Sequence, residues 1–304
     1  MSDVEVVITT DPRQKPTTFR GRVGTYFVLT KPRIIELLLV TTVPAMFVAA
    51  SGWPGTALVL STLIGGALSA AGANTINQVI DIDIDRLMKR TVGRPLPAGK
   101  ITARAALIFG IALGVLGFGV LAWSSNLLAA WLSTAGLLFY VFVYSMVLKR
   151  STVQNIVIGG AAGAVPALVG WAAVTDGLAV APWVMFAIVF FWTPPHFWAL
   201  AIRYKDDYSA AAVPMLPSVV GAERAMGHIA AYSVVMVGAA LSLWVTGAVG
   251  WIYLVASTAA GMWMLGLLRR LQRDANSAMS FFSASNVYLS VVFLAMIIDT
   301  LILT

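Results

Sequence analysis

The sequence contains no cysteine, which excludes disulfide bonds, thiolate zinc sites, iron–sulfur clusters and cysteine-attached haem. It is also poor in charge: 11% of its 304 residues are charged, against roughly 25% in soluble domains. With 59% hydrophobic residues and a mean hydropathy of +0.87, the chain cannot form a water-soluble globule. The net charge of +7 therefore indicates a lipid bilayer as the partner rather than a nucleic acid.

Nine apolar runs divide the chain, and each is long enough to cross about 30 Å of hydrocarbon as a helix. A spanning segment must satisfy its backbone hydrogen bonds internally, so continuous runs of this length predict α-helices. The runs cover residues 34–50, 56–80, 105–123, 127–147, 156–174, 179–202, 226–246, 248–267 and 281–302. The predicted fold class is therefore an all-α integral membrane protein with about nine transmembrane helices.

The basic residues fall on one side of this pattern. All 20 Lys and Arg residues lie before the first run or in the loops after the second, fourth, sixth and eighth runs. The positive-inside rule places these loops and the N-terminus on the cytoplasmic side of a cell (inner) membrane. Two of the loops, 81–104 and 203–225, are long and carry six acidic residues between them, so we expect the active-site cavity to open at the cytoplasmic face. Residues 1–24 are expected to form a flexible cytoplasmic tail, and residues 25–304 a single nine-helix membrane domain.

Acidic and amide side chains follow the second run at helical spacing. At 100° per residue, Asn77, Asp81 and Asp85 fall within a sector of roughly 80°, while Asp83 points to the opposite side. Two carboxylates on one helical face are costly at a membrane edge unless a cation neutralises them. Oxygen ligands of this kind suit Mg²⁺, which keeps some of its waters and bridges to a substrate phosphate. The basic residues that would face such a phosphate follow directly, and they are Lys89, Arg90 and Arg94.

Two of these features also have a simpler interpretation. The acidic residues could be paired only with the basic residues that follow them at a helix end. Lys149 and Arg150, which follow the fourth run at the same mouth, would either add cations around a diphosphate or act as ordinary interfacial anchors.

The end of the sixth run carries a second group of polar residues. Pro194 and Pro195 remove two backbone donors, so we expect a broken helix that lines a cavity at this depth. His196 follows the expected break, either as a functional residue or as a packing residue with satisfied hydrogen bonds. The charged residues beyond it are Arg203, Lys205, Asp206 and Asp207.

The spacing after the second run resembles a known signature. It reads Asn77-x₃-Asp81-x₂-Ile84-Asp85-x₂-Met88-x-Arg90-Thr91-x₂-Arg94-x₄-Gly99. This pattern is similar to that of the UbiA superfamily of intramembrane aromatic prenyltransferases, whose nine-helix fold agrees with the nine runs. The resemblance implies that the first Asp-rich motif holds Mg²⁺ on the diphosphate of an allylic prenyl donor.

The sixth run resembles one branch of that superfamily. The Thr-Pro-Pro-His-Phe-Trp stretch at 193–198 and the Val-Pro-Met-Leu-Pro stretch at 213–217 are similar to the haem O synthase branch. Other members carry carboxylates where His196 and Arg203 stand, so two equivalent Asp-rich motifs are not expected here. The resemblance implies transfer of a farnesyl group from farnesyl diphosphate to a vinyl group of haem b. Water then adds, and the products are haem O, for haem–copper oxidase assembly, and pyrophosphate.

The resemblance also implies roles for individual residues, with Mg²⁺ as the cofactor and haem b as a substrate. The residues expected at the reacting groups are Asn77, Asp81, Asp85, His196, Asp206 and Asp207, all of them metal ligands except His196. Those expected to bind the diphosphate are Lys89, Arg90, Arg94, Lys149, Arg150, Arg203 and Lys205. The expected partners are farnesyl diphosphate, haem b, the bilayer, and haem A synthase or terminal-oxidase assembly proteins, with no nucleic acid.

Two alternatives stay open at this point. A prenyltransferase acting on a quinone-ring precursor, of the hydroxybenzoate or naphthoate type, would share the first motif but should carry carboxylates in place of His196 and Arg203. A secondary transporter would also have intramembrane carboxylates and broken helices. Transporters place such charges near the bilayer midplane, whereas the acidic residues here gather at one face.

Overall fold

The apolar runs form long helices. The computed structural model describes residues 19–303, and for residues 19, 20, 33, 34, 36–39 and 303 it describes the backbone alone. Among these residues, eight helical segments are long and apolar enough to cross a membrane. They are α3 (Thr56–Ile80), α5 (Ala103–Ser124), α6 (Leu127–Leu138) with its continuation to Ser151, α8 (Asn155–Thr175), α9 (Val180–Arg203), α12 (Ala222–Val245), α13 (Trp251–Arg273), and α14 (Ala278–Leu303) with the preceding 3₁₀ turn η2 (Ala275–Ser277).

The remaining predicted span is also a helix. It corresponds to α2 (Pro32–Ala50), of which Val40–Ala50 forms a shorter apolar stretch. Each of the nine predicted runs therefore coincides with a helix. Since residues 19–303 contain no strand, the all-α fold class is confirmed.

The first described helix overlaps the predicted tail. Residues 1–18 lie outside the described residues, so for them the flexible tail stays a prediction. Residues 19–24 belong to α1 (Phe19–Leu29). This helix has packing partners: Leu29 is fully buried beside Leu96 and Ala106, and the Tyr26 ring meets the Phe109 ring edge-on at 4.8 Å between centroids.

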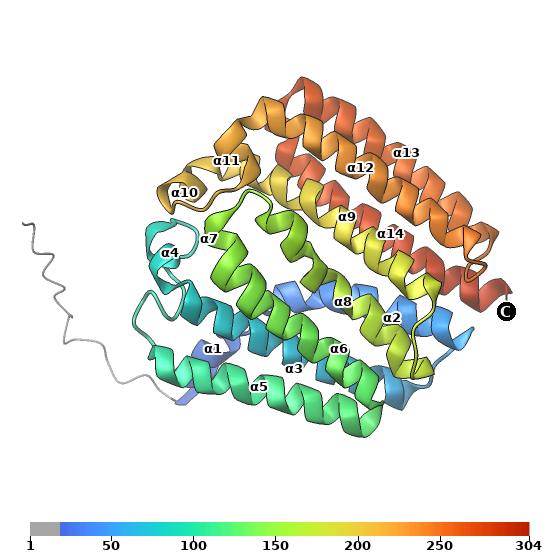
Figure 1. Ribbon diagram of the computed structural model, residues 1–304, viewed down its shortest axis with the longest axis horizontal. Coiled ribbons are helices and arrows are strands. Elements are labelled where there is room, and N and C mark those ends of the chain that lie inside the picture. The colour runs from blue at the N-terminus through green and yellow to red at the C-terminus, as the bar shows by residue number, and fades with distance from the viewer. Residues whose placement is uncertain (1–18, 304) are drawn as a thin grey trace, which may run out of the picture.

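The helices pack mostly against their neighbours in sequence. From α2 to α14, consecutive spanning helices contact one another, as short connections between antiparallel helices favour. The two ends of the series also meet, because α14 packs against both α2 and α9, and α8 packs against α2. Figure 1 shows the resulting bundle, with α2 lying inside it.

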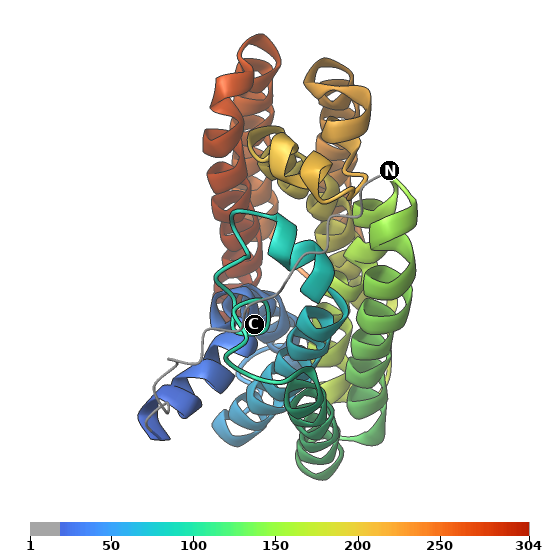
Figure 2. The ribbon, with the colours of Figure 1, turned by 90° about the vertical axis from the view of Figure 1, so that its left-hand side faces the viewer.

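Four short helices gather at one end of the bundle (Figure 1). They are α4 (Ile82–Leu87), α7 (Lys149–Ser151), α10 (Lys205–Ala210) and α11 (Leu216–Val220). Figure 2 looks onto this end, where α4 lies beneath α10 and α11. The long loops predicted to carry function therefore come together in space, although they lie more than a hundred residues apart in sequence.

The predicted break at Pro194-Pro195 is wrong. Helix α9 runs unbroken from Val180 to Arg203 with both prolines inside it. Proline removes two hydrogen bonds from the helix, but its fixed φ is itself helical. Both prolines are buried in protein, and the Thr193 hydroxyl donates to the Val189 carbonyl at 2.9 Å. These surroundings hold the turn together without a cavity-lining break.

Glycines let α3 and α5 approach each other closely. A Cβ added at Gly117 of α5 would lie 2.8 Å from both the carbonyl oxygen of Gly65 and the amide nitrogen of Ser69 in α3. A Cβ at Gly72 would similarly lie 2.6 Å from the Gly110 carbonyl oxygen. Backbone atoms cannot move aside as a flexible side chain would, so the close approach depends on glycine, as is common between membrane helices.

This contact predicts a position-specific loss of stability. Gly117→Ala should lower the free energy of unfolding by about 1–3 kcal/mol, the usual effect of overpacking, and so lower the Tm of the detergent-purified protein. Gly119→Ala is the matched control, because it lies two residues away on the same helix with nothing within 4 Å of the added Cβ. Equal Tm values for the two variants would contradict the packing account.

Candidate active site

A cavity of about 340 Å³ runs between the helices. Its walls are mostly apolar and come from α2, α3, α6, α8 and α9. At the short-helix end it is lined by polar groups, among them Asn77, Arg90 and Lys149. Thr62 also lines the cavity and lies 15 residues before Asn77 on α3. This separation corresponds to about 22 Å along the helix. The cavity therefore joins a charged mouth to a long apolar interior.

The predicted acidic face forms at the junction between α3 and α4. The Asp81 amide donates to the Asn77 carbonyl at 3.0 Å, and the Asp85 amide to the Asp81 carbonyl at 2.8 Å. Helical spacing thus continues through the junction, and Asn77, Asp81 and Asp85 are 3%, 0% and 1% exposed. Asp83 faces away, with its side chain 63% exposed. The three residues share a buried side, as their spacing predicts.

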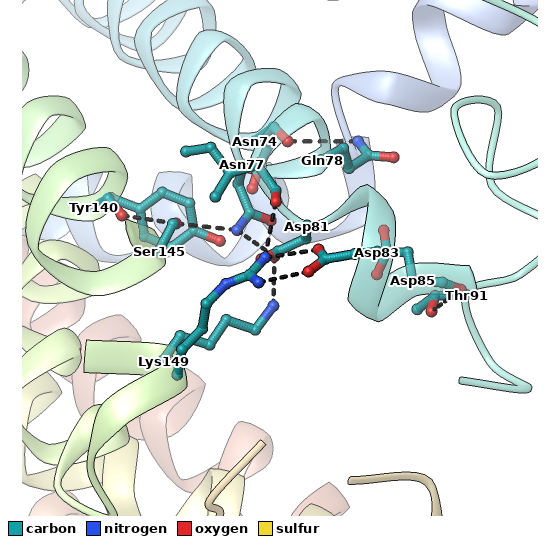
Figure 3. Close-up of polar contacts among 12 residues, drawn as sticks. Asn74, Asn77, Gln78, Asp81, Asp83, Asp85, Thr91, Tyr140, Ser145 and Lys149 are labelled. Carbon is teal, nitrogen blue, oxygen red and sulfur yellow. Dashed lines mark hydrogen bonds and ion pairs between the residues drawn. The ribbon is translucent and has the colours of Figure 1, made fainter. Parts of the chain in front are cut away.

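Hydrogen bonds fix the orientation of the Asn77 amide (Figure 3). Its Nδ2 donates to Asp81 Oδ2 at 2.7 Å and to Ser145 Oγ at 3.0 Å. The Ser145 hydroxyl in turn donates to the Tyr140 carbonyl at 2.8 Å. Asn77 Oδ1 is thereby left to accept from Lys31 Nζ at 2.9 Å.

Each buried carboxylate is paired with a cation from another segment. Lys149 Nζ contacts Asp81 Oδ2. Arg94 donates from Nη1 to both oxygens of Asp85, at 2.9 and 2.8 Å. A fully buried charge needs such a partner, because unpaired burial costs several kcal/mol.

Arg150 serves the exposed side of the same junction. Its guanidinium donates to both oxygens of Asp83, at 2.6 and 2.7 Å, and to the Ile80 carbonyl at 2.9 Å. Hydrogen bonding from Arg150 lowers the pKa of Asp83 to about 2. Arg150 Nη2 also lies 3.7 Å from Asp81 Oδ1. Arg150 therefore acts here as an anchor for α4 and does not line the cavity.

Lys31 is a cavity residue that the sequence reasoning did not single out. It adopts a left-handed backbone conformation, with φ of 52°, between α1 and α2. Asn74 and Gln78 of α3 hold this turn by donating to the carbonyls of Thr30 and Leu29, at 3.2 and 2.7 Å. A strained non-glycine residue held by such contacts is typical of functional sites. The signal in the sequence is the Leu-Thr-Lys-Pro-Arg stretch at 29–33, which lies at the mouth of the first span.

The cations at the mouth repel one another. Burial, with Arg94 and Lys149 nearby, lowers the pKa of Lys31 to about 7, although Asp85 and Asp81 act in the opposite direction. Arg90, the fourth cation that lines the cavity, lies near Tyr208 Oη at 3.5 Å and near the Tyr204 ring at 5.9 Å. Arg90, Arg94 and Lys149 already outnumber the two carboxylates, and Lys31 adds positive charge when it is protonated, so the mouth has an excess of positive charge that a bound anion would neutralise.

The second predicted group lies mostly outside the cavity. Arg203, Lys205 and Asp206 are exposed, Asp207 is half-buried, and none of them lines the cavity. Lys89, from the first predicted group, is also exposed and outside the cavity lining. Tyr208 of helix α10 does line the cavity, together with Val213 and Met215 of the following segment. The structure therefore brings α10 to the mouth through Tyr208 rather than through its carboxylates.

His196 lies behind the cavity wall. Its Nδ1 is 2.7 Å from Ser285 Oγ, and that hydroxyl lies 2.7 Å from the Phe282 carbonyl, to which it donates. The ring is stacked between Trp192 and Phe282, with centroids 4.2 and 4.3 Å apart. Trp192 lines the cavity, whereas His196 does not. This placement matches a packing residue with a satisfied hydrogen bond.

The donor set at the α3–α4 junction fits a divalent cation. Among the side chains that the structure describes, no three from His, Cys, Asp or Glu are grouped so that they could hold a metal ion on their own. The available ligands are instead two carboxylates and an amide oxygen, which leaves positions for water and phosphate as Mg²⁺ prefers. Asp81 Oδ1 is buried without a hydrogen-bond partner, so one ligand oxygen is free to bind a cation.

Sequence comparison finds close relatives. Residues 38–295 match the UbiA prenyltransferase family. The chain is 50% identical to protoheme IX farnesyltransferase 1 of Saccharopolyspora erythraea over 289 residues, which cover 93% of this chain and 92% of the relative. It is 51% identical to the protoheme IX farnesyltransferase of Gloeobacter violaceus over 281 residues, covering 91% and 92%.

Solved structures share the fold. A digeranylgeranylglyceryl phosphate synthase superposes with a TM-score of 0.75 at 19% identity, over 92% of this chain and 98% of that one. A UbiA homolog from Archaeoglobus fulgidus, bound to DMAPP and Mg²⁺, superposes with a TM-score of 0.66 at 18% identity, over 90% and 99%.

The Lys149–Asp81 pair predicts a non-additive loss of stability. Lys149→Met leaves the Asp81 carboxylate buried without its main cation, and breaking such a pair costs about 3–5 kcal/mol. Adding Asp81→Asn removes the unpaired charge, so the double variant should be more stable than Lys149→Met alone. Thermal unfolding of the wild type, the two single variants Lys149→Met and Asp81→Asn, and the double variant in detergent measures this coupling. Additive losses of stability would show that the two side chains do not interact.

Proposed function

The chain belongs to the UbiA prenyltransferase family, and on that premise we propose that it farnesylates haem b. It would transfer the farnesyl group of farnesyl diphosphate to a vinyl group of haem b, with addition of water, and so produce haem O and pyrophosphate for haem–copper oxidase assembly. The observation that carries the proposal is the mouth of the cavity, where four cations, Asn77 and Asp85 meet a long apolar interior. Asp81 lies directly behind this lining, in contact with Asn77 and Lys149. The names of the relatives, which are about half identical to this chain, support haem as the acceptor.

The diphosphate would lie among the cations of the mouth. Lys31, Arg90, Arg94 and Lys149 come from three different segments and all line the cavity. As the bond between the farnesyl carbon and the diphosphate oxygen breaks, negative charge grows on the leaving pyrophosphate. Fixed cations in a site that excludes water stabilise this growing charge more than the spread charge of the bound donor.

Asn77, Asp81 and Asp85 would hold Mg²⁺. The ion would neutralise the diphosphate and so make it a better leaving group. The solved structure of the Archaeoglobus homolog, with DMAPP and Mg²⁺, supports this choice of metal. Lys149 and Arg94 already contact the same carboxylates, so the cations that bind the phosphate also hold the metal ligands in place.

The apolar interior would take the farnesyl chain and the acceptor. A vinyl carbon of haem b forms a bond to the first farnesyl carbon while the carbon–oxygen bond breaks. Water then adds to the cation left beside the porphyrin and loses a proton, which leaves a hydroxyethylfarnesyl group. Trp192, Phe197 and Tyr144 line the cavity, and their ring faces would stabilise positive charge during the transfer.

Asp206 and Asp207 would act from the first turn of α10, next to Tyr208. They are candidates to accept the proton lost from the added water or to hold a second Mg²⁺. Arg203 and Lys205 would add positive charge at the approach to the mouth, where an anionic substrate arrives.

The orientation follows from the basic loops. Basic residues lie in the segment between α3 and α5, in α7, at and after the end of α9, and in the last turns of α13, and these parts lie at the short-helix end. By the positive-inside rule this end would face the cytoplasm from a cell membrane. Product haem would then pass within the bilayer to haem A synthase or to terminal-oxidase assembly proteins.

The test is a transfer assay with a matched pair of variants. Membranes that contain the protein, haem b, farnesyl diphosphate and Mg²⁺ should yield a haem whose mass increases by one farnesyl group and one hydroxyl group. Asp81→Asn should lower the rate by at least about a hundredfold, as loss of a group that stabilises the transition state does. Asp83→Asn should stay within severalfold of wild type, because Asp83 faces away from the cavity and pairs with Arg150.

Three outcomes would contradict the proposal. An unchanged haem mass with the wild-type protein would exclude haem b as the acceptor. A prenylated product formed only from a hydroxybenzoate or naphthoate would assign the enzyme to quinone synthesis. Wild-type turnover by Asp81→Asn would show that Asp81 is not a ligand of the metal.

A further inference from the structure

The helix that carries Lys149 is not α-helical in the turns that precede this residue. After α6, residues Phe139–Leu148 form the π-helix η1, and α7 follows it. The Lys149 amide donates to the Tyr144 carbonyl, five residues earlier. Most π-helices are single turns inside α-helices, they are less favourable than α-helix, and they occur frequently at functional sites. A ten-residue π-helix beside the cavity therefore indicates a functional role for this segment.

The wider winding changes which residues share a face. An α-helix turns 100° per residue, so Tyr140 and Lys149 would lie 180° apart on opposite faces. With i→i+5 hydrogen bonds a π-helix winds about 4.4 residues per turn, or about 82° per residue. Lys149 then lies within about 20° of Tyr140, and Tyr144 lies about 30° to the other side. An α-helix would keep Tyr140 and Tyr144 within about 40° of each other, so the π-helix matters for Lys149, which it brings to the same face.

The exposure of the side chains follows the π-helical pattern. Phe142, Met146 and Val147 are exposed on the outer surface of the protein, at 55%, 53% and 57%. These residues fall on one side of the segment at about 82° per residue. At 100° per residue Val147 would instead lie within about 20° of Tyr140, which lines the cavity.

The face of η1 that carries Tyr140 is directed toward the cavity. Tyr140, Tyr144 and Lys149 all line the cavity. The rings of Tyr140 and Tyr144 are stacked, with centroids 5.3 Å apart. Gly159 of α8 makes room for this face, since a Cβ there would lie 2.3 Å from Cδ2 of Tyr144. The Ser145 hydroxyl, which donates to the Tyr140 carbonyl five residues back, also accepts from Asn77.

We propose that η1 is a positioning element of the active site, whose π-helical winding turns Lys149 into the cavity beside Tyr140 and Tyr144. The functional half of the inference rests on the proposed diphosphate-binding role of Lys149. The same winding places Ser145 against Asn77, so one irregular segment sets both a phosphate-binding cation and a metal-binding amide. The cost of an unusual helix is offset by the pairing of Lys149 with the buried Asp81.

The absence of cysteine allows a direct test of the winding. Single substitutions Tyr144→Cys, Val147→Cys and Lys149→Cys are reconstituted in lipid nanodiscs and treated with a charged, water-soluble thiol reagent. Tyr144→Cys and Lys149→Cys should react at least about tenfold faster than Val147→Cys, and pyrophosphate with Mg²⁺ should slow both. Fast, pyrophosphate-protected labelling of Val147→Cys together with slow labelling of Lys149→Cys would indicate an α-helix and overturn the proposal.

Moving the lysine tests its function. Lys149→Leu should lower kcat/KM for farnesyl diphosphate at least about a hundredfold, and Lys149→Arg should restore part of it. The double variant Lys149→Leu with Val147→Lys should stay inactive, because position 147 faces outward. Rescue by the lysine at position 147 would overturn the proposed winding.

Full activity of Lys149→Leu with an unchanged labelling pattern would instead refute the diphosphate-binding role while leaving the π-helical register intact. Size-exclusion chromatography confirms that each variant is folded.

Discussion

Asp81 and Asp85 are almost fully buried carboxylates at the end of a membrane-spanning helix, and most of the site follows from the need to neutralise them. Water is not available to solvate them, and one unpaired charge at this depth would cost a large part of the stability of the protein. Each carboxylate therefore contacts a cation from a different segment: Lys149 after η1 and Arg94 after α4. Asn77 extends the set to Lys31 between α1 and α2. Folding the chain thus assembles the charges that the proposed chemistry uses.

The rest of the bundle serves this cluster by shaping an apolar cavity beneath it. Glycine contacts bring α3 and α5 together, and Gly159 of α8 leaves space for Tyr144. The four short helices lie around the charged mouth. The cavity extends from there between the long helices. A polar mouth above an apolar interior suits a substrate with a diphosphate at one end and a hydrocarbon chain at the other.

The sequence was sufficient for the long helices and for the Asn77–Asp81–Asp85 face, because both depend on local periodicity. It did not identify Lys31, whose position depends on a strained turn held by side chains of α3. It also did not identify η1, because its outward-facing and cavity-facing side chains are both apolar or aromatic, so no polar period marks the π-helical winding. The break expected after Thr193 is absent, since buried neighbours hold the helix through both prolines. The position of His196 behind Trp192 depends on α14, which lies about ninety residues further along the chain.

The central claim is that the four cations and the Asn–Asp–Asp set form one site for a metal-bound diphosphate. Calorimetric titration of the purified protein with an unreactive thio-analogue of farnesyl diphosphate tests it most directly. Binding should require Mg²⁺, and Lys31→Met should weaken it at least about tenfold, because charge-assisted contacts to phosphate contribute about 1.5–3 kcal/mol. Equal affinity with and without Mg²⁺, and in the Lys31→Met variant, would contradict the account.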